Sequence, residues 1–293
     1  MVNSTQLAVK AAPHVYLTEP LSGLAAWLCY FRDAEIPVLA ETAEALEALR
    51  EQEDERDDVD AGSLSEVIEN DPLMTLKLLA HVAAKRKPDA ATSTETITSA
   101  LLMMGIPPFF SNFGPQSTVE ERLQEYPLAL DGLRELLKRA ERATIFALGF
   151  AVHRADLDAA AIQLAAFLHD FAEMLLWCHA PTLALQIQDA QRADSTLRSA
   201  NIQRSVLNIE LDDLRQALMK EWSLPELLVH ISDGKRPDHP SVRNVLLAVR
   251  LARHTMLGWD NAAVPDDIEE IAALLNASPR IALAFVHKIE ESE

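Results

Sequence analysis

An almost uninterrupted run of apolar residues, 159–177, limits what this chain can fold into more than any other feature of its sequence. The run reads AAAIQLAAFLHDFAEMLLW, and in a helix its apolar residues would occupy every face. A helix that is apolar all round belongs in the interior of a protein, where other elements surround it. We therefore expect 159–177 to be the central helix of a helical core.

Two neighbouring ionisable residues, His169 and Asp170, interrupt this run. Burying an unpaired charge costs several kcal/mol or shifts its pKa until the group is neutral. The pair is therefore metal-bound, held in a hydrogen-bonded structural role, or inherited from an ancestor that used it. In a continuous helix His169 and Glu173 are four residues apart and can meet, whereas Asp170 points about 100° away from His169. We take His169 and Asp170 as the candidate site, with Glu173 as its helper.

The composition favours helices throughout the chain. Glycine occurs 8 times in 293 residues and aromatic residues make up 5%, whereas strands favour aromatic and β-branched residues and need turn glycines. A chain of this length corresponds to one large domain or two modest ones. We predict an all-α fold with two packed helical subdomains.

The charge balance argues against two classes of partner. The formal net charge of −19 repels nucleic-acid phosphates and anionic lipids, and the longest basic run is only 85–87. We expect no nucleic-acid partner and no membrane insertion, because no segment approaches 18 consecutive apolar residues. The two cysteines, Cys29 and Cys178, form no CxxC pattern, and no secretion leader is visible. We therefore expect a cytoplasmic protein with free thiols.

Capping patterns predict several helix ends. Helix starts are expected at Ser63 with Glu66, at Asp71 before Pro72, at Ser93 or Thr94 and at Ser223 with Glu226, and a left-handed C-cap is expected at Gly105. Two segments are expected to be loops: the acidic run 51–62 and the stretch 109–117, whose phenylalanines should pack under neighbouring helices. Apolar spacing predicts further helices over about 127–153, 181–193, 195–207, 211–222, 242–257, 265–275 and 279–289.

Five landmarks follow one another in a distinctive order. They read EIPVLAE, LSEVIENDPLMTLKLLA, TITSALLMMGI, AAFLHDFAEMLL and MKEWSLPELL. In this order they resemble the HDOD domain, the HD-related output domain of bacterial signalling proteins. The resemblance covers about residues 33–235 and implies an all-α fold related to metal-dependent HD phosphohydrolases, used as a regulatory module without established catalysis.

The resemblance also implies a division of the chain. Residues 1–32 would be an N-terminal tail and helix, and residues 33–235 the HDOD-like domain. That domain would have an N-terminal lobe at about 33–126 and an HD-like lobe at about 127–235. Residues 236–293 would form a C-terminal helical extension packed on the HD-like lobe.

The metal site that the resemblance implies for an HD phosphohydrolase is incomplete. Such an enzyme holds a divalent metal with a first His on an earlier helix, the HD pair and a later Asp. Between Glu95 and Arg142 there is no histidine, and Leu211 stands where relatives commonly carry one, eleven residues before Trp222. Metal-assisted hydrolysis needs three or more protein ligands and an open position for water.

We therefore expect a non-catalytic signalling module that binds a partner protein or a small regulatory ligand and uses no cofactor. The HD pair would then be vestigial. One alternative is an atypical phosphohydrolase acting on a nucleotide or cyclic dinucleotide, with a divalent metal held by His169 and Asp170. Another is a subunit of a two-component relay whose receiver domain lies on a different polypeptide.

Overall fold

The computed structural model describes residues 15–85, 96–194, 197–235 and 238–291. These residues form helices α1 to α17 and no strand; Val38 and Thr118 share one isolated bridge. The predicted all-α fold is confirmed. The predicted boundaries at 33, 127 and 236 stay predictions.

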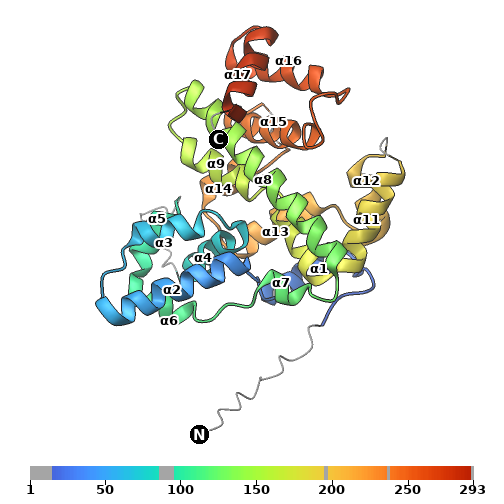
Figure 1. Cartoon of the computed structure of the whole chain (residues 1–293). Coiled ribbons are helices and arrows are strands. Elements are labelled where there is room, and N and C mark those ends of the chain that lie inside the picture. The colour runs from blue at the N-terminus through green and yellow to red at the C-terminus, as the bar shows by residue number, and fades with distance from the viewer. Residues whose placement is uncertain (1–14, 86–95, 195–196, 236–237, 292–293) are drawn as a thin grey trace, which may run out of the picture.

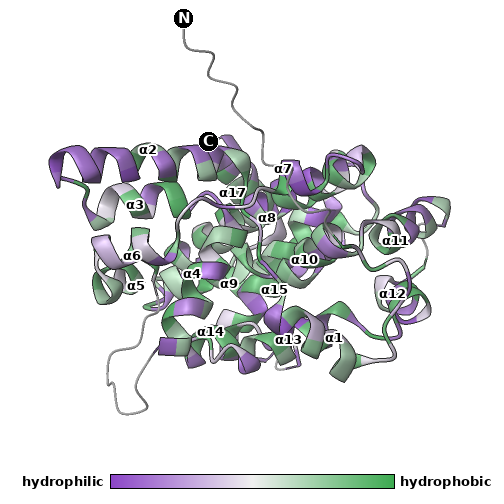
Figure 2. Ribbon diagram, turned by 90° about the horizontal axis from the view of Figure 1, so that it is seen from below, coloured by the Kyte–Doolittle hydropathy of each residue, from purple (hydrophilic) through white to green (hydrophobic). Residues whose placement is uncertain are grey.

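One group of helices precedes the long helix α8 and lies to one side of it (Figure 1). Its members are α2 (Ala40–Arg56), α3 (Ala61–Ile68), α4 (Pro72–Lys85), α5 (Ile97–Met104), α6 (Ile106–Asn112) and α7 (Val119–Arg122). Figure 2 shows α2 as mainly hydrophilic and α10 as mainly hydrophobic, in keeping with an exposed helix and a core helix.

A second group of helices contains α8, which begins and ends where the sequence predicted, and α9, α10 and α11 pack against it. It comprises α8 (Pro127–His153), α9 (Ala159–Phe167), α10 (Phe171–His179), α11 (Pro181–Ala193), α12 (Ser199–Leu207), α13 (Leu211–Glu221) and α14 (Glu226–Ile231). Helix α1 (Leu24–Asp33) packs on α13 of this group, and the indole Nε1 of Trp27 donates to the carbonyl oxygen of Leu207 at 2.8 Å.

The last three helices pack on α8 and on one another. Helix α15 (Pro240–His254) lies against α8 and α9, α16 (Val264–Leu275) against α15, and α17 (Pro279–Glu291) against α16 and α8. Figure 1 shows α16 and α17 at the end of the molecule farthest from α6 and α7.

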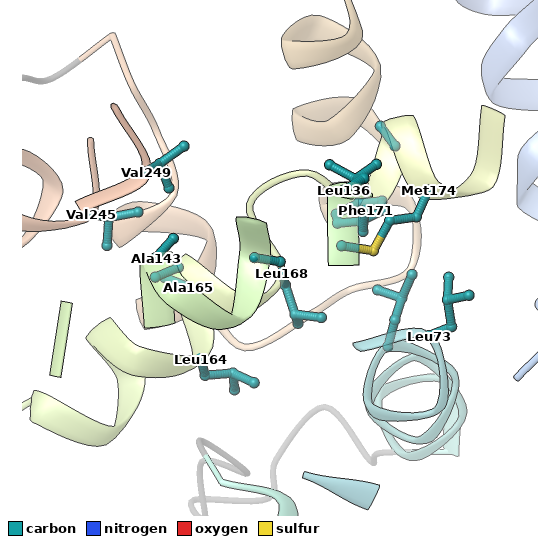
Figure 3. Packing of buried hydrophobic residues seen from close by; sticks show 14 of the residues in the cluster. Leu73, Leu136, Ala143, Leu164, Ala165, Leu168, Phe171, Met174, Val245 and Val249 are labelled. Atoms are coloured by element: carbon teal, nitrogen blue, oxygen red, sulfur yellow. The ribbon is translucent and has the colours of Figure 1, made fainter. Parts of the chain in front are cut away.

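The expected central helix is divided in two, which corrects the sequence prediction. Residues 168–170 form a turn between α9 and α10, in which the N–H of His169 donates to Ala166 and that of Phe171 to Leu168, both three residues back. The core is continuous across the turn, as Figure 3 shows for Val245 and Val249 near Ala143 and Ala165, and for Phe171 and Met174 near Leu136. By length and apolarity the segment Ala159–His179 could cross a membrane, but it is largely buried inside the protein.

Helix α4 begins as predicted. Asp71 Oδ1 accepts from the N–H groups of Leu73 and Met74 at 2.8 and 3.0 Å, and Pro72 occupies the first position. The other Asp71 oxygen accepts from the N–H of Leu39 at 2.8 Å and so fixes the approach to α2. A buried N-cap carboxylate with several backbone donors stabilises both the helix and the neighbouring chain.

Other predicted helix ends are wrong or fall elsewhere. Asp60, not Ser63, caps α3, and Ser223 adopts a positive φ of 52° while α14 begins after Pro225 without a side-chain cap. Gly105 ends α5 at φ 83° and ψ 155°, which lies outside the left-handed helical region. Ser93 and Thr94 lie outside the described residues, and Thr96 caps α5.

Both predicted loops are partly helical. Helix α2 continues through the acidic run to Arg56, and Arg50 pairs with Glu47 and Asp54 one turn away on either side. Helix α6 occupies 106–112, with its prolines in the first turn, where a missing N–H carries no penalty. Phe109 and Phe113 are buried, as predicted.

Candidate functional site

The candidate site lies at the turn between α9 and α10. His169 Nδ1 is 2.8 Å from Asp170 Oδ1, and the two side chains are 16% and 11% exposed. The sequence prediction paired His169 with Glu173 and turned Asp170 away, and this is wrong. The i,i+4 rule holds only within a continuous helix, and the helix ends at this pair.

An arginine that the sequence reasoning missed completes the site. Arg139 on α8 donates from Nε and Nη2 to Asp170 Oδ2 at 3.2 and 2.8 Å, and from Nη2 to Glu173 Oε2 at 3.1 Å. Glu173 therefore joins the pair through Arg139. The spacing of residues along α8 could have pointed to Arg139. It lies three residues after the buried Leu136 and four before the buried Ala143, and therefore on the side of α8 that faces the core.

The charges at the site depend on one another. Burial, the largest single influence, would raise the pKa of Asp170, but the Arg139 guanidinium, the contact with His169 and the charge of Arg253 together outweigh burial and hold that pKa well below the usual range. Burial opposes the charge of Arg139 too, yet Asp170 and Glu173 raise its pKa. Asp170 and Arg139 therefore form a permanent ion pair at neutral pH.

His169 is neutral in this setting. Burial lowers its pKa, and Arg215 lowers it further, while Asp170 works in the opposite direction. Because a carboxylate only accepts, the proton of the neutral ring lies on Nδ1 and is donated to Asp170 Oδ1.

A second buried arginine holds the backbone of the turn. Arg215 on α13 donates from Nη1 to the carbonyl oxygen of His169 and from Nη2 to that of Ser232, both at 3.0 Å, and it also pairs with Asp212. Its side chain is 3% exposed. The turn is thus fixed by one arginine on its side chains and another on its backbone.

The side chains at this turn already satisfy one another. Both Asp170 oxygens are engaged, one by His169 and the other by Arg139, which also binds Glu173. Within the part of the chain that the structure describes, no three His, Cys, Asp or Glu residues are grouped to hold a metal ion. Leu211 is buried among apolar residues. The cation at this carboxylate is Arg139.

The cysteine beside a histidine, Cys178, is not an activated nucleophile. Its thiol is buried, and burial raises its pKa to about 12. The neighbouring His179 interacts through its ring nitrogens with Tyr30, Arg122 and the carbonyl oxygen of Glu35. This network connects α1, α7 and α10.

A helical array with a His–Asp pair at an internal turn defines an HD-like helical domain. A family model described as the HDOD domain matches residues 36–234, and the chain belongs to the HDOD domain family. Comparison with the curated proteins gave no match.

Solved structures support the same fold. The MmoQ response regulator from Methylococcus capsulatus is similar at a TM-score of 0.58 and 18% identity, over 87% of this chain and 99% of that one. A virulence factor from Campylobacter jejuni is similar at a TM-score of 0.57 and 16% identity, over 92% of this chain and 100% of that one. At these identities the likeness shows the fold alone.

Proposed function

We propose that this chain is a non-catalytic regulatory module that binds a partner protein or a small regulatory ligand. We also propose that its HD pair has a structural role: the contact of Asp170 with Arg139, which we call the latch, holds the turn between α9 and α10 in place. The observation that carries the proposal is the ion pair between Arg139 and Asp170, extended to Glu173. Membership of the HDOD family supports a signalling role, and one structural relative is named a response regulator.

The structural role of the HD pair follows from the ion pairs that a metal ion bound at Asp170 would break. For a metal to bind Asp170, the guanidinium of Arg139 would have to leave the carboxylates of both Asp170 and Glu173. The Arg139 side chain is only 18% exposed, so water could not replace these contacts freely. Removing one partner of a buried ion pair costs about 3 to 5 kcal/mol, and a metal would have to recover that cost with too few ligands. The residues therefore favour a fixed internal cation over an exchangeable one.

Elemental analysis tests this proposal. Wild-type protein and the His169→Ala variant are purified, equilibrated with Mn²⁺, Fe²⁺, Ni²⁺ or Zn²⁺, and desalted. We expect no stoichiometric metal in either protein, and no hydrolysis of nucleotides or cyclic dinucleotides that depends on His169. Stoichiometric metal in the wild type that is lost in His169→Ala would favour the phosphohydrolase alternative instead.

A further inference from the structure

A cavity of about 700 Å³ lies among the last two helices and the connection between α15 and α16. Helix α17 contributes Arg280, Leu283 and His287, whose spacing of three and four residues puts them on one face of the helix. Helix α16 contributes Val264 and Ile268, which are four residues apart and therefore share a face too. Sites for small molecules are clefts of about 300 to 1000 Å³, with a mainly apolar lining and a few polar groups. This cavity has that size, and its walls come from separate segments of the chain.

The wall between the two helices is the indole of Trp259, in the connection between α15 and α16, and two contacts fix its position. Its Nε1 donates to Glu290 Oε2 at 3.2 Å, and Glu290 is itself paired with Arg142 on α8. The ring of His287 lies against the indole, with centroids 4.1 Å apart and planes at 45°. The indole is only half-buried, so part of its aromatic surface borders the cavity. We call this cavity the Trp259 cleft.

The lining of the Trp259 cleft between its charged groups is apolar. Ile268 on α16 is 5% exposed, whereas Leu283 on α17 is 38% exposed, and both line the cavity. An exposed apolar surface gains free energy when a ligand removes it from water. The cleft therefore favours a ligand with an apolar or aromatic body.

Two carboxylates at the lining are unpaired. Asp260 directly follows Trp259 in the chain, and Glu269 lies on α16. Among the residues that the structure describes, neither carboxylate has a hydrogen-bond or ion-pair partner. Of the described lining residues, Arg280 alone is a lysine or arginine. It lies seven residues before His287, and therefore about 10 Å along α17 from the end of the cleft at Trp259.

The charges favour a cation at the Trp259 end of the cleft. A tryptophan ring attracts an ammonium group within about 6 Å of its centre more strongly than the other aromatic rings do. Asp260 adds a carboxylate beside it, and the net charge of −19 attracts cations to the protein from a distance. An anionic ligand would instead meet two unpaired carboxylates and a single arginine. The aromatic wall and the unpaired carboxylates thus select the same class of ligand.

We propose that the Trp259 cleft binds a small amphipathic organic cation, with its ammonium group at Trp259 and Asp260 and its apolar body in the middle of the cleft. The cleft lies beyond the residues 36–234 that match the family model. This inference rests on the proposed regulatory function and names the chemical class of its small ligand. Its test leaves the HD pair intact, and the metal analysis does not involve the cleft, so the two proposals fail separately.

Three probes with the same naphthyl ring test the charge of the ligand: naphthylethylamine, naphthylethanol and naphthylpropionate. At about pH 7 the first is a cation, the second is neutral and the third is an anion. Calorimetric titration measures their binding to the full chain, and NMR follows the indole N–H signal of Trp259, assigned with Trp259→Phe. We expect saturable binding of the amine, about tenfold tighter than that of the alcohol, and a shift of the Trp259 signal. The carboxylate should bind more weakly than the alcohol.

Two variants and a matched control locate the site. Asp260→Asn changes an exposed residue and should weaken binding of the amine about fivefold, the upper end for an exposed charge pair, while binding of the alcohol stays unchanged. Leu283→Lys places a cation in the cleft at an exposed position and should abolish binding of the amine. The control is Asp266→Asn, because Asp266 is also exposed and on α16 but does not line the cleft; it should change the affinity by less than about twofold.

Four results would each overturn the proposal. The first is no saturable binding of the amine, and the second is binding of the alcohol or the carboxylate as tight as that of the amine. The third is an amine affinity that Asp260→Asn and Leu283→Lys leave unchanged. The fourth is binding of the amine without a shift of the Trp259 signal, which would place the cation elsewhere on the protein.

Discussion

The guanidinium of Arg139 on α8 holds the carboxylate of Asp170 at the start of α10 through two hydrogen bonds of 2.8 and 3.2 Å. The same guanidinium reaches Glu173 one turn later. A contact between residues 31 positions apart thus fixes the turn at which the central apolar segment is interrupted. It also accounts for an ionisable pair, His169 and Asp170, inside an otherwise apolar core.

Replacing Arg139 tests the strength of this latch. Arg139→Met keeps most of the side-chain volume but leaves Asp170 and Glu173 facing each other without a cation. We expect the free energy of unfolding to fall by about 3 kcal/mol, the range seen when one partner of a buried pair is removed. Urea denaturation monitored by circular dichroism measures it. The matched control is Arg192→Met, because the Arg192–Glu135 pair is 62% and 63% exposed, and its loss should change stability by less than about 0.5 kcal/mol. Equal effects of the two changes would contradict the latch.

Replacing Asp170 should act in the same direction. Asp170→Ala removes the acceptor for His169 and Arg139 and leaves buried donors unsatisfied, at a cost of about 1 to 3 kcal/mol. A lowered melting temperature is therefore expected. An unchanged melting temperature combined with loss of a bound metal would instead identify Asp170 as a ligand.

The pH dependence of stability should carry a signature of His169. Burial and Arg215 lower the pKa of His169 in the folded state, whereas the His169 side chain in the unfolded chain has the ordinary histidine pKa of about 6.5. Below pH about 6.5 the unfolded state therefore binds a proton that the folded state does not, and stability falls as the pH drops toward the folded pKa. The groups that face His169 are Asp170, Arg215 and Arg253. His169→Gln should flatten the profile between about pH 7 and pH 5; an identical slope in the variant would count against this assignment.

A close contact between α8 and α10 predicts an unusual response to alanine. A Cβ at Gly132 would lie 2.6 Å from the ring of Trp177, whereas one at Gly149 would meet the flexible end of Ile289. Glycine to alanine in a helix ordinarily stabilises by up to about 1 kcal/mol. Gly132→Ala should instead destabilise by about 1 to 3 kcal/mol through overpacking, and Gly149→Ala by clearly less. Thermal unfolding of both variants measures the two changes in stability. A Gly132→Ala variant more stable than the wild type would contradict the prediction and show that the indole of Trp177 can move aside.

The two cysteines should react at different rates. Cys29 is exposed, whereas Cys178 is buried with a pKa raised to about 12. Because the thiolate is the reactive species, iodoacetamide should modify Cys29 in the native protein and Cys178 only after unfolding. Mass spectrometry of peptides from native and urea-treated protein measures this. Rapid native labelling of Cys178 would contradict its burial.

Local chemistry allowed much of the fold to be predicted from the sequence. The start of α4 at Pro72 and the whole of α8 follow from an N-cap and from apolar spacing, which act over one or two turns. The break at 168–170 could not be predicted in this way, because it contains neither glycine nor proline and depends on Arg139 and Arg215 from other helices. The N-cap predicted at Ser63 was wrong for a local reason, because Asp60, three residues earlier, caps α3 instead.

The candidate site was predicted in part. His169 and Asp170 were identified because charges in an apolar run are rare, and the structure brings Glu173 to them. To predict which residues His169 and Asp170 contact, one would have to know that the helix breaks at 168–170. To predict the contact with Arg139, one would have to know how α8 packs against α10. Both are tertiary features that a pattern along one segment does not contain.

Anomalous diffraction from crystals grown with Mn²⁺ tests the central claim most directly. We predict electron density for the Arg139 guanidinium in contact with Asp170 and Glu173, and no anomalous peak beside His169. An anomalous peak between His169 and Asp170, with Arg139 displaced from the carboxylates, would contradict the structural latch.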